Sequence, residues 1–111
     1  MATKLPNGAS AVIPIEKLVG YCLNPNHSSG KHKARVFASA LGIKAGNAAD
    51  LQQLIALAAI EGEVVQQDST AFGQLYKVDW VIINHAPLVL RTLWEIRTGQ
   101  SVPRLVSAFI K

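Results

Sequence analysis

Apolar positions along the chain follow two different spacings, and the change falls near Gly62. Before Gly62, apolar residues recur three and four positions apart, which is typical of helices that bury one side. After it, they alternate with polar residues, which is the spacing of strands with one buried face. The pattern therefore predicts helices first, followed by strands joined by short turns.

Three helices are expected in the first half of the chain. The first starts with Pro14, which suits the first helical position, and ends before Asn24-Pro25-Asn26. The second runs from a cap at Ser28 or Ser29 to Leu41, and Gly42 then suits a left-handed cap. The third is capped by Asn47, carries Asp50 in its first turn and stops near Gly62. The apolar stripes are Ile15, Leu18, Val19, Cys22 and Leu23 in the first helix, Val36, Phe37, Ala40 and Leu41 in the second, and Leu51, Leu54, Ile55, Ala58 and Ala59 in the third.

Four strands are expected after Gly62, and Asn84-His85-Ala86-Pro87 is expected to close the second of them. The sequence thus predicts an α+β fold with two to three N-terminal helices followed by a four-stranded antiparallel meander sheet, covered by helices on one face. Residues 1–12 lack periodicity and are expected to form a flexible leader, and residues 13–111 a single α+β domain. The predicted strands are Glu63–Asp68, Tyr76–Ile82, Leu88–Arg97 and Arg104–Ile110.

Composition favours a folded domain that does not span a membrane. The 111 residues are half hydrophobic and 16% charged, which favours one folded domain over disorder. The net charge of +4 favours polyanionic partners, although it equally serves solubility. No apolar run is long enough to span a membrane and no secretory signal is visible, so we expect a cytoplasmic protein without a membrane partner. The single Cys22 falls on an apolar stripe and is expected to be a buried structural thiol.

The start of the second helix carries an unusual charge pattern. Lys31, Lys33 and Arg35 crowd its first turns, with His32 among them, and His27 lies just before. Cations there oppose the helix dipole by about 0.3–1 kcal/mol each, whereas an anion would be stabilised. Lys33 alone falls on the apolar stripe, so its ammonium is expected at the mouth of the core. The alternative is an ordinary amphipathic helix on which Lys33 extends its charge to solvent.

The residue types and their spacing exclude several known kinds of site. The three histidines and Cys22 lack metal-ligand spacing, and Ser28-Ser29-Gly30-Lys31 lacks the first glycine of a phosphate-binding loop, so neither a metal nor a cofactor is expected. A nucleophilic triad is not excluded by the residue counts, although no serine lies in a nucleophile-elbow pattern.

A metal-independent ribonuclease needs groups that move protons and cations that stabilise phosphorane charge. The predicted catalytic residues are Lys33, His32, Arg104 and Thr92, and the predicted binding residues are Lys31, Arg35, His27, Trp94 and Arg91. In this scheme Lys33 and Arg104 hold the phosphate, while His27 or His32 moves protons. The alternative is that the arginines of the strands, Arg97 included, are solvated residues on the wet face and that Trp94 belongs to the core.

Several short motifs occur together along the chain. They are Lys17-Leu18, Tyr21-Cys22-Leu23, His27, Gly30-Lys31-His32-Lys33-Ala34-Arg35-Val36-Phe37, Leu41-Gly42-Ile43, Gly73, Tyr76, Arg91-Thr92-Leu93-Trp94 and Pro103-Arg104-Leu105-Val106. These motifs resemble an uncharacterised domain family of small bacterial proteins, and the likeness covers nearly the whole chain after the leader. The order of its elements is similar to that of the barnase–EndoU–colicin–RelE group of ribonuclease toxins, which implies a place in small two-gene or conflict modules.

Three functional hypotheses follow. The first is a small metal-independent endoribonuclease toxin that acts on RNA and is neutralised by a small acidic immunity or antitoxin protein. The second is a non-catalytic module that binds nucleic acid or a protein through the same basic helix start. The third is a structural domain whose sheet edge pairs with a second copy, although the sequence does not define an oligomeric state.

Overall fold

A computed structural model describes residues 3–28, 30–82 and 88–111. Its helical part precedes its strands, as predicted, and the change falls at Gly62. The helical elements are η1 (Gly8–Ser10), α1 (Ile15–Lys17), η2 (Leu18–Cys22), α2 (Lys31–Leu41), η3 (Ala45–Asn47) and α3 (Ala48–Glu61). The strands are β1 (Glu63–Thr70), β2 (Gly73–Val81), β3 (Val89–Arg97) and β4 (Arg104–Ile110). The predicted α+β fold is confirmed.

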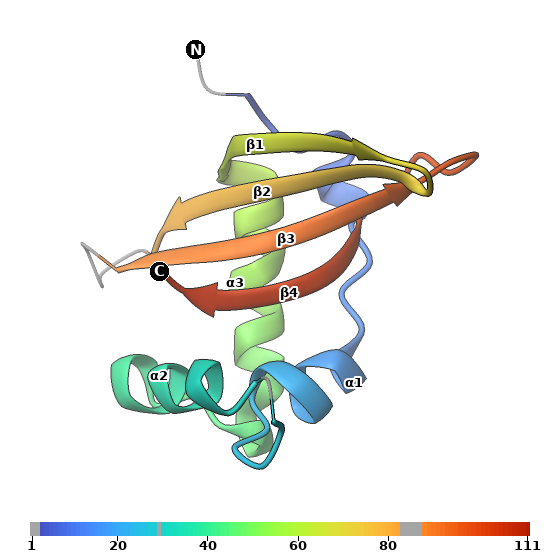
Figure 1. Ribbon diagram of the computed structural model, residues 1–111. Helices are drawn as coiled ribbons and strands as arrows, with labels where there is room; N and C mark the ends of the chain where they lie inside the picture. The colour runs from blue at the N-terminus through green and yellow to red at the C-terminus, as the bar shows by residue number, and fades with distance from the viewer. Residues whose placement is uncertain (1–2, 29, 83–87) are drawn as a thin grey trace.

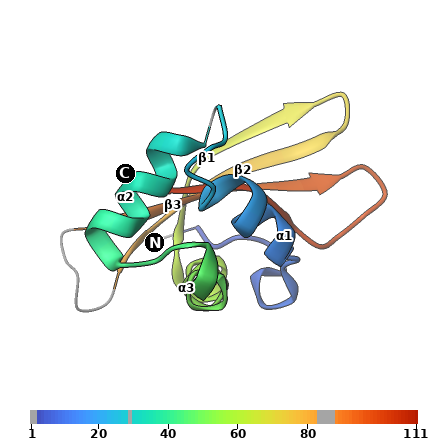
Figure 2. The same ribbon diagram turned by 90° about the horizontal axis from the view of Figure 1, so that it is seen from below.

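The four strands form one antiparallel sheet in the order β1-β2-β3-β4. Helix α3 crosses one face of this sheet, and α1 and α2 lie beyond its β4 edge (Figure 1). The view from below shows α3 end-on, with the strands passing above it (Figure 2). We call the face against α3 the inner face and the opposite one the outer face.

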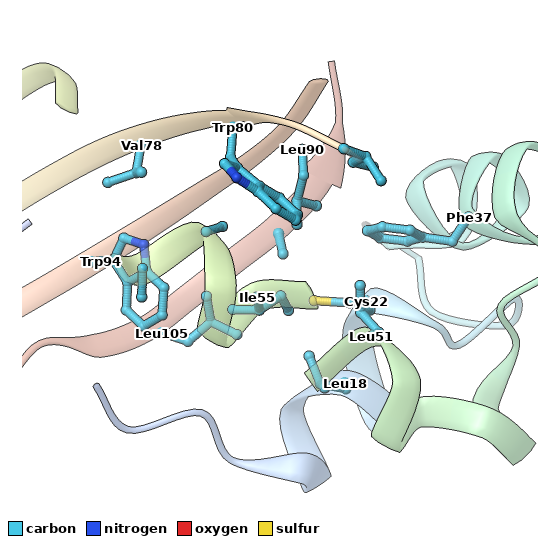
Figure 3. Close-up of a cluster of buried hydrophobic side chains, with 14 of the residues drawn as sticks. Leu18, Cys22, Phe37, Leu51, Ile55, Val78, Trp80, Leu90, Trp94 and Leu105 are labelled. Carbon is cyan, nitrogen blue, oxygen red and sulfur yellow. The ribbon is translucent and has the colours of Figure 1, made fainter. Parts of the chain in front are cut away.

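The core lies between the inner face and the helices (Figure 3). Alternate residues of β2 and β3, such as Val78 and Trp94, point into it because successive side chains of a strand point to opposite faces. The fully buried residues labelled in Figure 3 include Leu18, Cys22, Phe37, Leu51, Ile55, Leu90 and Leu105. Cys22 is thus buried as predicted, and burial raises the pKa of its thiol.

Helix α2 ends as predicted, with Gly42 in the left-handed region at φ 68°. Its start and its buried side differ from the prediction. Ser28 does not cap it, and Ser29 lies outside the described residues. Instead, the carbonyl oxygen of His27 accepts a hydrogen bond from the Lys31 N–H at 3.0 Å. Ala34 and Phe37 form the buried side, whereas Val36 is 41% exposed.

The first helix also differs, because α1 continues as a wider π-helical turn. The N–H of Leu23 donates to the carbonyl of Leu18, five residues earlier, at 2.8 Å. Pro14 is the N-cap of α1 and not its first residue. The wide turn buries Leu18, Cys22 and Leu23 together and leaves Val19 exposed.

Residues 3–12 make specific contacts, so the expectation of a flexible leader is wrong for this segment. Leu5 is only 4% exposed and belongs to the core. Gly8 approaches α3 so closely that a Cβ would collide with the Ala59 carbonyl. The carbonyl of Thr3 accepts the Val64 N–H of β1, and Val12 pairs with Arg104 of β4. The segment therefore satisfies backbone groups at both sheet edges, a demand that its own sequence pattern does not show.

The predicted cap of α3 and the predicted turn after β2 are the remaining local predictions. Asn47 is the N-cap residue of α3 and Asp50 lies in its first turn, as predicted, but the Asn47 side chain accepts the Lys44 N–H instead of an N–H of α3. The predicted turn at Asn84-His85-Ala86-Pro87 lies outside the described residues. Within the described ranges, no helix combines the length and apolar character that crossing a membrane requires.

The packing of the N-terminal segment leads to a stability prediction. Leu5→Ala should lower the free energy of unfolding by about 2–4 kcal/mol, because it removes buried methyl groups and leaves a cavity. Urea denaturation measures the change. Ser10→Ala, at an exposed position of the same segment, is the control and should have little effect. Equal stability of Leu5→Ala and the wild type would contradict the packed arrangement.

Candidate functional site

A cluster of polar and aromatic side chains surrounds Lys33 at the β4 edge. We call Tyr21, His27, Lys33, Ser107 and Phe109 the Lys33 cluster. The Lys33 ammonium donates hydrogen bonds to Tyr21 Oη at 2.9 Å and to Ser107 Oγ at 3.2 Å. Its Nζ also lies 5.1 Å from the ring centre of Tyr21 and 4.9 Å from that of Phe109. The ammonium is thus held by two hydroxyls and lies near two aromatic rings.

A bulge in β4 brings Ser107 into this cluster. Trp94 pairs with Leu105 and Leu93 pairs with Ser107, so Val106 is an extra residue on β4. In a regular strand, Ser107 would share the inner face with Leu105, two positions earlier. The extra residue instead turns Ser107 and Phe109 to the outer face, where the first turns of α2 and Tyr21 meet them. Ser107 is then only 4% exposed although it does not face the core.

The His27 side chain binds the backbone of the loop that precedes α2. Its Nδ1 accepts the Gly30 N–H at 3.0 Å, so in this arrangement the neutral ring carries its proton on Nε2. The His27 ring also meets the Tyr21 ring edge-on, with the ring centres 4.8 Å apart. Gly30 lies so close to the Tyr21 carbonyl that a side chain there would collide with it. These contacts hold the phenol and the imidazole side by side.

The electrostatics of the cluster are those of a cation without a carboxylate. Within the part of the chain that the structure describes, the ion pairs are Asp79–Arg91, Glu95–Arg97 and Asp79–Lys111, and none includes Lys33. The hydrogen bond from Lys33 lowers the pKa of Tyr21, and Ser107 adds to this effect. A half-buried ammonium with neutral partners keeps its full charge for an anionic ligand, and a phenol with a lowered pKa is suited to proton transfer.

The structure brings two of the predicted site residues, Lys33 and His27, into one cluster. As predicted, Lys33 is half-buried beside the element on which α2 packs, β4, but its ammonium contacts residues that the bulge turns away from the core. Lys31, His32 and Arg35 are exposed on α2. They form a basic strip outside the cluster.

The four predicted residues of the strands lie outside the cluster, although Arg91 pairs with Phe109 of the cluster across β3 and β4. Thr92 and Trp94 are fully buried on the inner face, where the Trp94 indole N–H donates to Thr92 Oγ1 at 2.7 Å. Their burial separates them from any ligand on the outer face, as the alternative reading of Trp94 expected. Arg91 is on the outer face and makes two hydrogen bonds to Asp79, at 2.7 and 2.8 Å. Arg104 is exposed at the start of β4.

The sequence prediction missed Tyr21, Ser107 and Phe109. Tyr21 lies just before Cys22, which is a residue of the apolar stripe of the first helix. Nothing in that pattern marks the Tyr21 hydroxyl as functional. Ser107 is a polar residue in a strand of apolar neighbours, which was the available signal. Its partner Lys33 lies 74 residues away along the chain, so spacing could not connect the two.

Metal-ligating side chains do not gather in the described residues: they contain no group of three or more His, Cys, Asp or Glu that could hold an ion. The cation in the cluster is the Lys33 ammonium.

The chain belongs to a family described as a domain of unknown function, DUF6883, which matches residues 4–111. This agrees with the resemblance to an uncharacterised domain family. No curated protein and no solved structure matches the chain significantly. The likeness to ribonuclease toxins therefore stays a prediction.

The buried hydrogen bond between Thr92 and Trp94 leads to a test of the role of Thr92. Thr92→Val keeps the shape but leaves the buried indole N–H without its acceptor, which should lower the free energy of unfolding by about 1–3 kcal/mol. Chemical denaturation measures this loss, and ligand binding on the outer face should be unchanged. A stable variant with impaired binding would assign Thr92 to the site instead.

The Asp79–Arg91 pair leads to a pH prediction. Arg91 lowers the pKa of Asp79, so the stabilisation is present above the ordinary carboxyl pKa of about 3.9 and is lost as pH falls through the lowered value. With both side chains mostly buried, Asp79→Asn should lower the free energy of unfolding at pH 7 by about 1–2 kcal/mol.

Urea denaturation of wild type and Asp79→Asn, at neutral pH and in acid, measures this difference, which should shrink once Asp79 is protonated. Glu95→Gln is the matched control, because its partner Arg97 is mostly exposed and the pair should contribute little. A difference that does not depend on pH would contradict the ion-pair explanation.

Proposed function

We propose that this member of the DUF6883 family binds an RNA phosphodiester at the Lys33 cluster and cleaves it without a metal ion. The observation that carries the proposal is the Lys33 ammonium, which contacts two hydroxyls and two rings and has no carboxylate partner among the described residues. Such a cation stabilises charge on a phosphoryl group more strongly than one that is already neutralised.

The residues of the cluster suit the steps of RNA cleavage. The 2′-hydroxyl of RNA supplies an internal nucleophile, and its oxygen forms a bond to phosphorus as the bond to the 5′ oxygen breaks. The hydrogen bond from Lys33 lowers the pKa of Tyr21. The phenolate form of Tyr21 accepts the proton of the 2′-hydroxyl, and the leaving 5′ oxygen takes a proton from water. Lys33 stabilises the negative charge of the pentavalent state, and Ser107 holds the ammonium in place. His27, whose ring meets that of Tyr21 edge-on, lies beside this proton acceptor.

A non-catalytic nucleic-acid-binding module is the second candidate. The observation that favours it is the exposed basic strip of Lys31, His32 and Arg35 on α2, which attracts phosphates whether or not cleavage follows. The net charge of +4 also supports the proposed small acidic partner, because opposite charges speed association.

Two variants separate catalysis from binding. Lys33→Ala should lower turnover of RNA by about 10²–10³ while binding changes little, because its charge is needed most in the transition state. Tyr21→Phe keeps the ring and removes the hydroxyl, so it should remove the rise in rate that accompanies deprotonation of Tyr21 in the wild type. Turnover, affinity and the pH–rate profile are measured on purified protein, with folding checked by circular dichroism.

Lys31→Ala is the matched control, because it removes an exposed cation from the same helix and should affect only binding. In the same assay, His32→Ala and Arg104→Ala test the catalytic roles predicted for those residues. If folded wild-type protein binds RNA and leaves it intact, and Lys33→Ala weakens that binding, the binding module replaces the enzyme. If RNA is neither bound nor cleaved, both candidates are wrong.

A further inference from the structure

A groove lies on the outer face of the sheet next to the Lys33 cluster. Its volume is about 220 Å³, which is smaller than the ~300–1,000 Å³ of pockets for drug-sized ligands and suits one small ring system. Apolar side chains of Leu75, Leu93 and Val106 line it. Gln66, Asp68 and Lys77 add polar groups from β1 and β2.

The strand register connects this groove to the cluster. Gln66 pairs with Lys77, Lys77 with Leu93, and Leu93 with Ser107, so these four residues form one row across all four strands. Ser107 ends the row and accepts the hydrogen bond from Lys33. Because neighbouring strands lie about 4.8 Å apart, Lys77 and Ser107 are separated by roughly 10 Å across the sheet. A ligand that lies along the row from Lys77 to Ser107 has a cation at each end, Lys77 and Lys33, and the apolar side chain of Leu93 as a floor between them.

The polar groups of the groove include both donors and acceptors. Lys77 Nζ donates to Gln66 Oε1 at 3.1 Å, and Gln66 Nε2 donates to Asp68 Oδ2 at 2.7 Å. Two other carboxylates of the outer face, Asp79 and Glu95, are paired with arginines. A purely hydrocarbon ligand would gain nothing from this polar edge. A nucleobase has an apolar face for the floor and a hydrogen-bonding edge for Asp68 and Lys77.

We propose that the groove is a nucleobase subsite for single-stranded RNA whose neighbouring phosphate lies at Lys33. The subsite rests on the proposed function, because it requires RNA at the Lys33 cluster. Lys77 contacts the next phosphate along the strand, and the Asp68 carboxylate accepts a hydrogen bond from an exocyclic amino group. The groove therefore favours cytosine, whose N4 amino group is a donor, over uracil, which has an acceptor at the same place.

The test uses two RNA hexamers, hexacytidine and hexauridine, with 2′-O-methyl groups that block cleavage. Fluorescence anisotropy of labelled hexamers should show hexacytidine bound about threefold to tenfold more tightly by the wild type. Asp68→Ala should remove this preference. Lys77→Ala should weaken both hexamers and reduce the slope of log affinity against log salt by about 0.7.

Three further variants keep the test independent of folding. Leu93→Asp should weaken both hexamers at least about tenfold, because it places a charge on the apolar floor, whereas Leu93→Met should bind as the wild type does. Lys44→Ala, which removes an exposed cation from the connector after α2, should leave the cytidine preference unchanged. Circular dichroism checks each variant.

The outcomes separate this inference from the proposed cleavage. If the cytidine preference and its loss in Asp68→Ala are found and native RNA stays intact, the subsite stands and the catalytic proposal fails. If native RNA is cleaved and both hexamers bind equally to wild type, Asp68→Ala and Leu93→Asp, the subsite is wrong. If Leu93→Asp converts an oligomer to a monomer in sedimentation without changing RNA affinity, the face joins copies of the chain and the subsite is again overturned.

Discussion

The sheet is covered by α3 on one face only, and this constraint shapes the rest of the structure. Because side chains alternate between faces, every inward apolar residue of β2 and β3 has an outward neighbour that must be stable in water. The outer face meets this demand with ion pairs, Asp79 with Arg91 and Glu95 with Arg97. It also leaves an apolar groove between β1 and β4, in one row with Ser107, which accepts a hydrogen bond from Lys33 at the β4 edge.

Lys33 has no carboxylate partner among the residues that the structure describes. Partial burial of an ammonium costs free energy, and hydroxyls and aromatic faces recover part of it without neutralising the charge. A carboxylate partner would hold Lys33 more firmly and would also compete with any anionic ligand. The cluster is thus organised in the way that anion recognition requires, and the lowered pKa of Tyr21 follows from the same hydrogen bond.

Two local irregularities assemble the cluster, and neither is visible as a periodic pattern. The π-helical turn of η2 contains more residues per turn than an α-helix. The direction of the Tyr21 side chain therefore differs from the one that α-helical spacing predicts. The bulge at Val106 adds one residue to β4 and reverses the faces of all residues that follow it. Bulges redirect side chains in this way next to functional sites, and here the redirected residues are Ser107 and Phe109.

The order of helices and strands could be predicted from the sequence, because hydrophobic spacing depends only on which side of each element is buried. The helix end at Gly42, where a left-handed residue is needed, and the partial burial of Lys33 follow from the same local patterns. The residues that meet Lys33 are set by tertiary contacts, since Ser107 lies 74 residues away and reaches it through a bulge that pairing with β3 defines. Tertiary contacts also turn Thr92 and Trp94 to the core and bring residues 3–12 to the sheet edges. These outcomes depend on contacts between distant segments, and local spacing carries no information about such contacts.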